Sequence, residues 1–120
     1  MKKLVIIGLG SMGKRRIRLI KRAYPDIVLI GIDSREDRRA ETKDLYGINT
    51  FGDLTEAIER EAPDAAFVCA SPLYHYKLIR ICLQNRLHVF TEINLINENH
   101  RELIELSKAN DCKLFLSSSM

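Results

Sequence analysis

Three glycines near the N-terminus have the spacing that brings a protein backbone close to a phosphate group. The segment Gly8-Leu9-Gly10-Ser11-Met12-Gly13 reads GxGxxG and directly follows the apolar run Leu4-Val5-Ile6-Ile7. In such a loop the first glycine makes a tight turn, the second lets the backbone approach a pyrophosphate, and the third lets the next helix pack closely. The positive end of that helix then faces the phosphates. The pattern predicts a dinucleotide site formed by Gly8, Gly10, Ser11, Met12 and Gly13.

An acidic residue stands where the ribose of such a nucleotide is expected. Asp33 ends a second apolar run about 20 residues after Gly13, the spacing at which a carboxylate accepts hydrogen bonds from ribose hydroxyls. Ser34 and Arg35 follow it and are predicted to complete the binding turn. A turn used only for packing, with Asp33 as an ordinary helix cap, is the weaker interpretation because strand, glycines, helix and acid are all in register.

The same turn bears on the choice of cofactor. The carboxylate of Asp33 repels a 2′-phosphate and therefore favours NAD. Arg35, Arg38 and Arg39 lie just beyond it and could hold such a phosphate, so NADP stays open as the second cofactor. We expect NAD.

Short apolar runs alternate with longer amphipathic segments along the whole chain. Runs typical of buried strands cover residues 4–7, 27–32, 48–51, 65–69, 87–90 and 113–116. Helices are expected over 11–24, from a cap at Ser34 to Tyr46 with Gly47 as left-handed terminator, after a cap at Asp53, over 73–84, and after a cap at Asn97.

This alternation predicts the fold class and the place of the site. Strands covered on both faces, each followed by a helix, are typical of α/β proteins. We predict a Rossmann-type doubly wound, mainly parallel six-stranded sheet with helices on both faces. Ligands of such sheets bind beyond the carboxyl ends of the strands, where the glycines and Asp33 are found.

Composition narrows the class of protein further. The chain has 120 residues, 46% of them hydrophobic and 29% charged, which is typical of one globular domain. The apolar runs are too short to span a bilayer, and the first one stops at Gly8, so we expect neither a membrane segment nor a signal peptide. Cys69, Cys82 and Cys112 form no CxxC pair and predict buried thiols in a reducing compartment. We therefore expect a cytoplasmic protein without a metal site.

The basic residues give little support to a nucleic-acid partner. Net charge is only +3, too small to indicate nucleic-acid binding by itself. Six basic residues of the first helix, from Lys14 to Arg22, are not interleaved with aromatic residues. We interpret them as a solvated face, with Arg15 or Arg16 free to assist the cofactor electrostatically.

Two later segments carry a family resemblance. Asp64-Ala65-Ala66-Phe67-Val68-Cys69-Ala70-Ser71-Pro72 with His75 is similar to a D-x-V-x-x-x-T-P…H segment, and His88-Val89-Phe90-Thr91-Glu92 is similar to K-H-V-x-x-E-K-P. Both segments occur in the glucose–fructose oxidoreductase, inositol dehydrogenase and MocA (Gfo/Idh/MocA) family. Together with residues 4–13 and Asp33, they make the whole chain resemble the N-terminal cofactor domain of that family.

The resemblance implies further site residues and a larger protein. It adds the following residues to the cofactor site, on the nicotinamide side: Ala70, Ser71, Pro72, His75 and Glu92. The spacing from Ser-Pro to His75 is one residue shorter than in the family. The resemblance also implies that residues 1–120 form the NAD(P)-binding Rossmann domain, that a C-terminal substrate domain lies outside this chain, and that the full protein is a homo-oligomer.

The sequence departs from the family pattern directly after Glu92. Ile93-Asn94 stands where the family has Lys-Pro, and that lysine normally assists proton transfer at the reacting hydroxyl. Isoleucine has neither a donor nor a titratable group, so we predict no catalytic residue within this chain.

Two functions remain open at this point. The first is an oxidoreductase that transfers hydride between nicotinamide and a hydroxyl-bearing carbon of a sugar, polyol or related small molecule. The alternative is a non-catalytic NAD(P)-binding sensor or regulatory module that has lost the lysine. A methyltransferase is disfavoured, because its glycine loop usually reads GxGxG.

Overall fold

The chain forms alternating strands and helices, as predicted. The computed structural model describes the backbone of residues 2–69, 72–93, 108–109 and 114–118, and the side chains of residues 2–69, 77–90 and 108–109. In chain order the elements are β1 (Lys3–Ile7), α1 (Ser11–Ala23), β2 (Val28–Ile32), α2 (Glu36–Tyr46), β3 (Asn49–Phe51), α3 (Leu54–Glu61), β4 (Ala65–Val68), α4 (Pro72–Gln84), β5 (His88–Ile93) and β6 (Leu114–Ser118).

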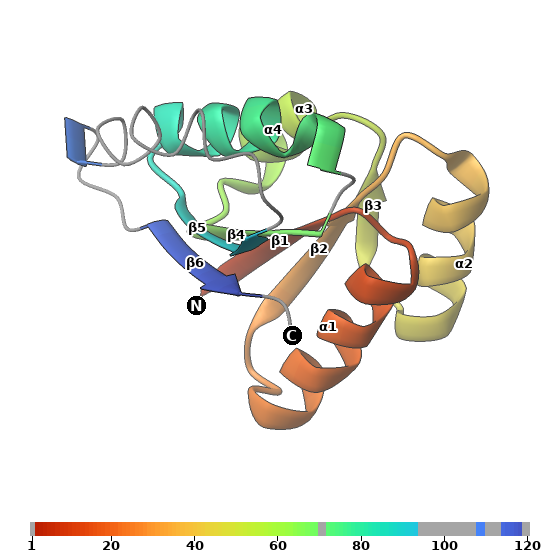
Figure 1. The fold of residues 1–120 in the computed structure, drawn as a ribbon. Helices are drawn as coiled ribbons and strands as arrows, with labels where there is room; N and C mark the ends of the chain where they lie inside the picture. The colour runs from red at the N-terminus through yellow and green to blue at the C-terminus, as the bar shows by residue number, and fades with distance from the viewer. Residues whose placement is uncertain (1, 70–71, 94–107, 110–113, 119–120) are drawn as a thin grey trace.

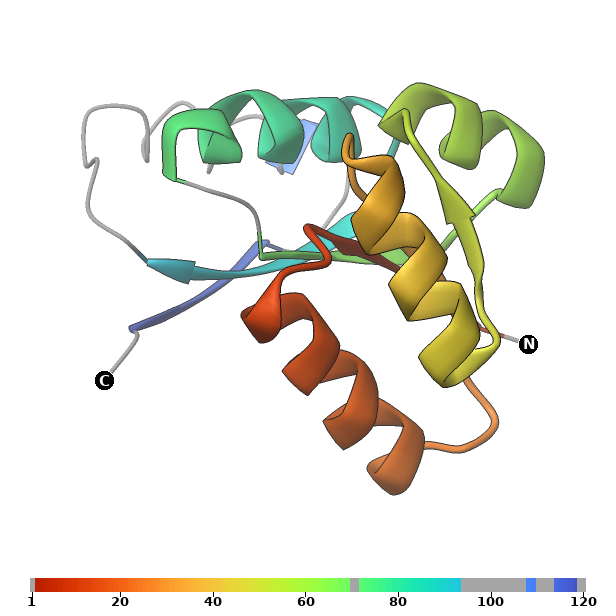
Figure 2. The same cartoon turned by 90° about the vertical axis from the view of Figure 1, so that its right-hand side faces the viewer.

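The strands form one parallel sheet with the order of a doubly wound fold. The order is β3-β2-β1-β4-β5-β6, and every neighbouring pair is parallel. Helices α1 and α2 cover one face, and α3 and α4 cover the other (Figures 1 and 2). The order reverses at β1, because the chain moves outward to β2 and β3 and then returns to β4. The predicted α/β Rossmann-type sheet of six strands is confirmed.

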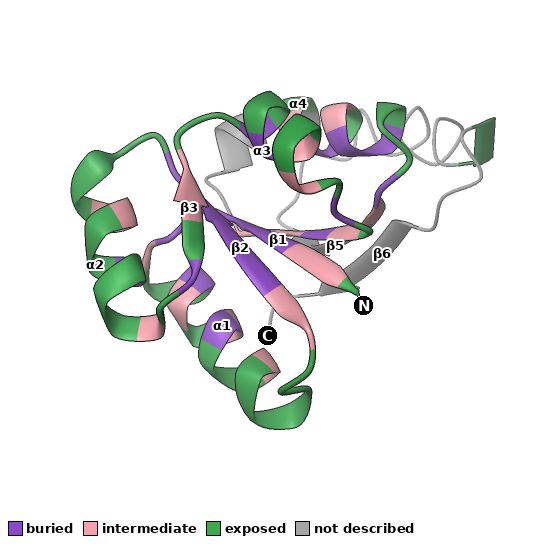
Figure 3. Cartoon of the chain, turned by 180° about the vertical axis from the view of Figure 1, so that it is seen from behind, coloured by how far each residue is buried: buried purple, intermediate pink, exposed green. Residues whose placement is uncertain are grey.

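Two buried clusters hold the layers together, and each lies on one face of the sheet. The larger joins the sheet to α3 and α4 through residues such as Val5, Ile30, Leu83 and Val89. The smaller joins the sheet to α1 through Ile17 and its neighbours. Figure 3 shows the buried residues along the strands and the exposed ones on the outer sides of the helices. Because both faces are covered, the strands are apolar at consecutive positions.

Most predicted helix ends are confirmed, and one cap is wrong. Gly47 ends α2 with φ 65°, and the Asp53 side chain caps α3 by accepting from the Glu56 amide. Ser34 does not cap α2: the N-cap is Arg35, without a side-chain cap. The Asp33 carboxylate accepts from the Arg35 amide at 2.9 Å, as in an Asx turn. Arg35 is extended, with φ −85° and ψ 121°, so the helix begins one residue later than predicted. The predicted cap at Asn97 lies outside the described residues.

The remaining differences are small shifts at element ends. The first helix ends at Ala23 rather than Tyr24, and α4 begins at Pro72 rather than Leu73, a position that proline favours. Strand β5 continues to Ile93, beyond the predicted end at Phe90. No helix within the described part of the chain is long and apolar enough to cross a membrane.

Candidate functional site

The sheet register places the ends of three strands side by side. Ile7 pairs with Ile32 on one side and with Val68 on the other. Backbone hydrogen bonds continue past these residues, from Gly8 N to Ile32 O at 2.8 Å and from Cys69 N to Ile7 O at 2.7 Å. A cleft of about 730 Å³ opens at this edge, within the range typical of ligand sites.

The three motif glycines differ in what surrounds them. Gly8 has φ 97°, a conformation that other residues rarely adopt. A side chain on Gly13 would overlap the carbonyl oxygen of Gly8, so the helix packs against the turn only with glycine there. A Cβ on Gly10 would meet nothing nearer than the Arg38 guanidinium, 3.6 Å away. Gly8 and Gly13 therefore shape the loop, whereas Gly10 leaves open space.

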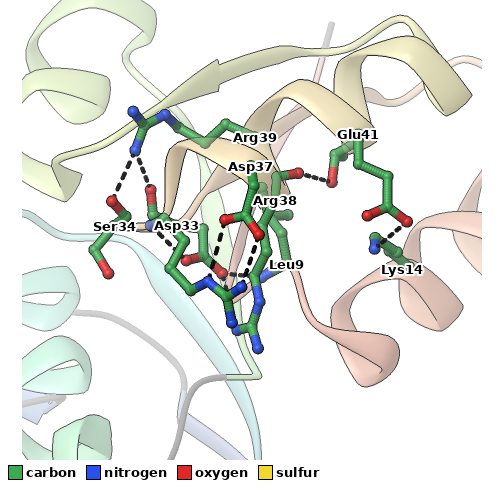
Figure 4. A network of polar contacts seen from close by, with 10 residues as sticks. Leu9, Lys14, Asp33, Ser34, Asp37, Arg38, Arg39 and Glu41 are labelled. Atoms are coloured by element: carbon green, nitrogen blue, oxygen red, sulfur yellow. Dashed lines mark hydrogen bonds and ion pairs between the residues drawn. The ribbon is translucent and has the colours of Figure 1, made fainter.

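The carboxylate of Asp33 ties the glycine loop, residues 8–13, to the turn between β2 and α2. Its Oδ2 accepts from the Leu9 amide at 2.9 Å, and its Oδ1 accepts from the Arg35 amide at 2.9 Å. The side chain is only 7% exposed, and Arg38 Nη1 lies 3.5 Å from Oδ2 (Figure 4). Two amides thus fix the orientation of the carboxylate, and each oxygen keeps an acceptor position for a further donor.

The three arginines after Asp33 have different partners. Arg35 forms a two-bond pair with Asp37, at 3.1 and 2.7 Å. This hydrogen bonding, helped by the charge of Asp37, raises the pKa of Arg35, and the bond from Arg35 lowers the pKa of Asp37. Arg39 Nη1 donates to the carbonyl oxygens of Asp33 at 2.8 Å and Ser34 at 3.1 Å (Figure 4). Only the guanidinium of Arg38 lies against both Asp33 and Gly10.

The cleft therefore has two unlike sides. The side that we call the polar wall contains Gly8, Gly10, Ser11, Met12, Asp33, Ser34, Arg35 and Arg38. The opposite side, the apolar wall, presents Leu54 of α3 with Leu78 and Ile81 of α4, and Asp53 and Lys77 lie beside them. Leu78 and Ile81 are half-buried against the larger core cluster. The polar wall offers charges and hydrogen-bonding groups, and the apolar wall offers a surface on which a flat ring can pack.

The structure brings together seven of the predicted site residues at this cleft: Gly8, Gly10, Ser11, Met12, Asp33, Ser34 and Arg35. Gly13 is buried beneath the loop and does not line the cleft. Ala70 and Ser71 lie outside the described residues. Pro72 and His75 belong to α4, and Glu92 belongs to β5, but the side chains of these three lie outside the described part.

Sequence reasoning missed the apolar wall and the turn from β3 to α3. Gly52, Asp53 and Leu54 reach the cleft because β3 pairs with β2, with Phe51 beside Ile32. The signal was present in the chain, since any turn after a parallel strand lies at the same edge of the sheet. Leu78 and Ile81 gave no such signal, because they resemble ordinary core positions of a helix.

The basic face of α1 contributes to packing more than we expected. Lys14 pairs with Glu41 of α2 at 2.7 Å, and Arg16 lies over the ring of Phe67 at 4.9 Å. Arg18 and Lys21 both donate to Tyr46, at 3.0 Å each. The prediction of a solvated face is therefore only partly right, since four of the six basic side chains hold α1 to its neighbours.

The predictions for the cysteines have mixed outcomes. Cys82 is a buried free thiol, and burial raises its pKa to about 12. Cys69 is in no disulfide and is only half-buried, at the cleft edge, and Cys112 lies outside the described residues. His88, the first residue of β5, is half-buried. Within the described part of the chain, no cluster of His, Cys, Asp and Glu could hold a metal ion.

Comparison with known proteins identifies relatives along nearly the whole chain. Residues 2–118 match the model of the Gfo/Idh/MocA family, described as an oxidoreductase family with an NAD-binding Rossmann fold. The myo-inositol 2-dehydrogenase of Thermotoga maritima is 35% identical over an alignment of 116 residues, and the match covers 92% of this chain and 34% of that protein.

Solved structures are similar over the same region. A probable dehydrogenase from Thermotoga maritima has a TM-score of 0.85 and 32% identity, and the match covers 96% of this chain and 35% of that one. The WlbA dehydrogenase of Bordetella pertussis, solved with NADH and UDP-GlcNAcA, has a TM-score of 0.88 at 17% identity, over 96% of this chain and 35% of that one. The latter likeness shows the fold alone.

This chain spans about a third of the length of these relatives. The resemblance drawn from residues 4–13, Asp33 and the segments ending at Pro72 and Glu92 is confirmed by the family match over residues 2–118. The chain belongs to the Gfo/Idh/MocA family of oxidoreductases with an NAD-binding Rossmann fold.

Proposed function

We propose that the cleft at the carboxyl ends of β1 and β2 binds the adenosine and pyrophosphate part of NAD(P). One observation carries this proposal: the hydrogen bond from Leu9 N to Asp33 Oδ2 at 2.9 Å. That bond joins the phosphate-binding loop and the ribose-binding acid in one rigid unit.

The residues present fit such a cofactor. Gly10 leaves open space beside the N-terminal end of α1, where amides and the helix dipole favour a pyrophosphate. Asp33 keeps acceptor positions for ribose hydroxyls. The apolar wall of Leu54, Leu78 and Ile81 suits the adenine ring. Gly13 supports this site from beneath the loop.

We further propose that the nicotinamide half extends toward residues that the family resemblance assigns. These residues are Ala70, Ser71, Pro72, His75 and Glu92. When bound, the cofactor supplies the hydride chemistry, and the protein contributes binding and orientation. On this proposal the described part of the chain binds the dinucleotide and excludes water from the adenosine end of the cofactor.

The activity of the whole protein is proposed from its relatives. We propose that residues 1–120 are the NAD(P)-binding domain of an oxidoreductase acting on a hydroxyl-bearing carbon of a sugar, polyol or related small molecule. The names of the two relatives above 30% identity, a myo-inositol 2-dehydrogenase and a probable dehydrogenase, support this class. They do not favour the non-catalytic alternative.

Three finer points belong to the same proposal. Because Ile93 cannot transfer a proton, a residue outside this chain handles the proton of the reacting hydroxyl, in a separate substrate domain. The full protein forms a homo-oligomer. The buried thiol of Cys82 supports a reducing, cytoplasmic location.

Calorimetric titration with NADH tests the proposal. We expect the protein to bind NADH, and Asp33→Asn to weaken binding on the order of tenfold, because the amide offers one acceptor oxygen in place of a carboxylate. Asp44→Asn is the matched control, since Asp44 is exposed on α2 and does not line the cleft. No binding at millimolar NADH, or an equal loss in both variants, would contradict the proposed site.

A further inference from the structure

The glycine loop offers backbone amides to a phosphate but no charged side chain. Residues 8–13 include neither lysine nor arginine. Lys14, the first basic residue after the loop, pairs with Glu41 of α2 at 2.7 Å and does not line the cleft. The end of a helix carries only a partial positive charge, whereas a pyrophosphate is a dianion. A side chain that balances this charge must therefore come from another element of the cleft.

Three cationic side chains line the cleft: Arg35, Arg38 and Lys77. Arg35 pairs with Asp37 at 2.7 Å. Arg38 Nη1 lies 3.5 Å from Asp33 Oδ2. None of the ion pairs among the described residues includes Lys77, and its side chain is exposed. Within the described part of the chain, Lys77 is therefore the cleft cation without a carboxylate partner.

Lys77 reaches the cleft from the side opposite to the first helix. It belongs to α4, and Figure 1 shows α4 and α1 on opposite faces of the sheet. Helix α4 begins at Pro72, shortly after the end of β4, where Cys69 N donates to Ile7 O at 2.7 Å, next to the glycine loop. Lys77 is about one turn nearer to this end of α4 than Ile81. Because the cleft opens at the edge of the sheet, α1 and α4 can contact one ligand from two faces.

The surroundings of Lys77 suit a residue that moves onto an anion. Its neighbours in the cleft include Leu78 and Ile81, and a lysine stem can lie along such an apolar surface while the ammonium reaches outward. Asp53 also lines the cleft, but its Oδ2 accepts from the Glu56 amide at 3.1 Å as the cap of α3. A lysine ammonium binds phosphate as a point charge on a flexible stem. Lys77 gives up no ion pair of the described residues when it does so.

We propose that Lys77 binds the pyrophosphate of the cofactor from the α4 side, so that the anion lies between its ammonium and the amides at the start of α1. This inference rests on the proposed cofactor site, and it adds a residue that neither the glycine motif nor Asp33 predicts. NAD and NADP share the pyrophosphate, so Lys77 should strengthen the binding of both alike. A ligand with a diphosphate, such as ADP, should depend on Lys77, whereas adenosine should not.

The test measures NADH binding by calorimetry, and the binding of ADP and adenosine by displacement of NADH. Lys77→Gln is expected to weaken NADH and ADP on the order of tenfold, because a charge-assisted hydrogen bond is lost. Adenosine should change by less than about twofold, since it has no phosphate to lose that bond. Lys77→Arg keeps the charge and should bind ADP within about threefold of the parent. Added salt should weaken ADP binding more in the parent than in Lys77→Gln.

Arg80→Gln is the matched control, because Arg80 is an exposed cation of the same helix that does not line the cleft. It should change all three affinities by less than about twofold. The inference is overturned if Lys77→Gln binds NADH as the parent does, if it weakens adenosine as much as ADP, or if Arg80→Gln causes the same loss. In each of these cases the parent still binds NADH and the proposed cofactor site stands. Absence of NADH binding by the parent would overturn that site, and this inference with it.

Discussion

The two walls of the cleft are built by different means. The polar wall is held by directed contacts: Asp33 receives two backbone amides, and Lys14 of α1 pairs with Glu41 of α2. The apolar wall belongs to α3 and α4, which rest on the larger buried cluster. Helix α2, by contrast, has Thr42 as its one buried residue.

We expect the two walls to contribute differently to the affinity for the cofactor and to the discrimination between NAD and NADP. An apolar wall gains binding energy from any flat ring and does not distinguish NAD from NADP, since the adenine is common to both. A polar wall with fixed charges distinguishes them, because a 2′-phosphate changes charge and hydrogen bonding at that place. We therefore expect substitutions in the apolar wall to change the affinities for both cofactors equally, and substitutions in the polar wall to change them unequally.

The largest effect is expected at Gly13, beneath the polar wall. Gly13→Ala places a methyl group on the carbonyl oxygen of Gly8, so the loop and α1 must separate. Such overpacking should lower the free energy of unfolding by about 3 kcal/mol or more. Urea unfolding followed by circular dichroism measures this loss. A Gly13→Ala protein as stable as the parent would show that the loop does not pack as described.

An intermediate effect is expected at Leu78 in the apolar wall. Leu78→Ala removes part of the ring-packing surface and should weaken NADH and NADPH equally, by about threefold to tenfold. The control is Leu45→Ala on α2, where Leu45 is 58% exposed and does not line the cleft. Calorimetry with both cofactors makes the comparison. A selective loss of one cofactor in Leu78→Ala would contradict the division between the walls.

The smallest effect is expected at the end of α3. Ala62 has φ 46°, a left-handed conformation that glycine adopts without penalty. Ala62→Gly should raise the free energy of unfolding by about 1 kcal/mol and leave NADH affinity unchanged. The same substitution at Ala40, inside α2, should lower it by about 1 kcal/mol. Urea unfolding measures both changes. If the two substitutions changed the free energy of unfolding in the same direction, the left-handed conformation of Ala62 would be contradicted.

Much of the fold follows from local pattern alone. Buried strands are apolar at consecutive positions, and each is followed by a helix, so the parallel sheet and its carboxyl edge are predictable. The GxGxxG spacing and Asp33 then place the polar wall at that edge. The predicted cap at Ser34 is wrong because Arg35, bonded to Asp33 in an Asx turn, is extended and α2 begins only at Glu36. Sequence alone does not show that such a turn delays the start of a helix by one residue.

The rest of the site depends on contacts between distant segments. Gly10 and Gly13 are both glycines of one motif, and sequence does not distinguish their roles. The turn brings the Gly8 carbonyl close to position 13 and makes glycine necessary there, whereas position 10 is open. Arg35, Arg38 and Arg39 are equivalent in sequence, and their partners alone separate them. Leu78 reaches the cleft through the packing of α4, which a helical apolar stripe does not reveal.

The most direct test of the account is the NADH affinity of Gly10→Ala. Gly10 has φ −75°, which alanine adopts readily, and its Cβ position is open. We expect the variant to unfold within about 1 kcal/mol of the parent, and to bind NADH on the order of a hundredfold more weakly because the methyl group occupies the pyrophosphate position. A folded Gly10→Ala protein that binds NADH as tightly as the parent would contradict the proposed contact between this loop and the cofactor.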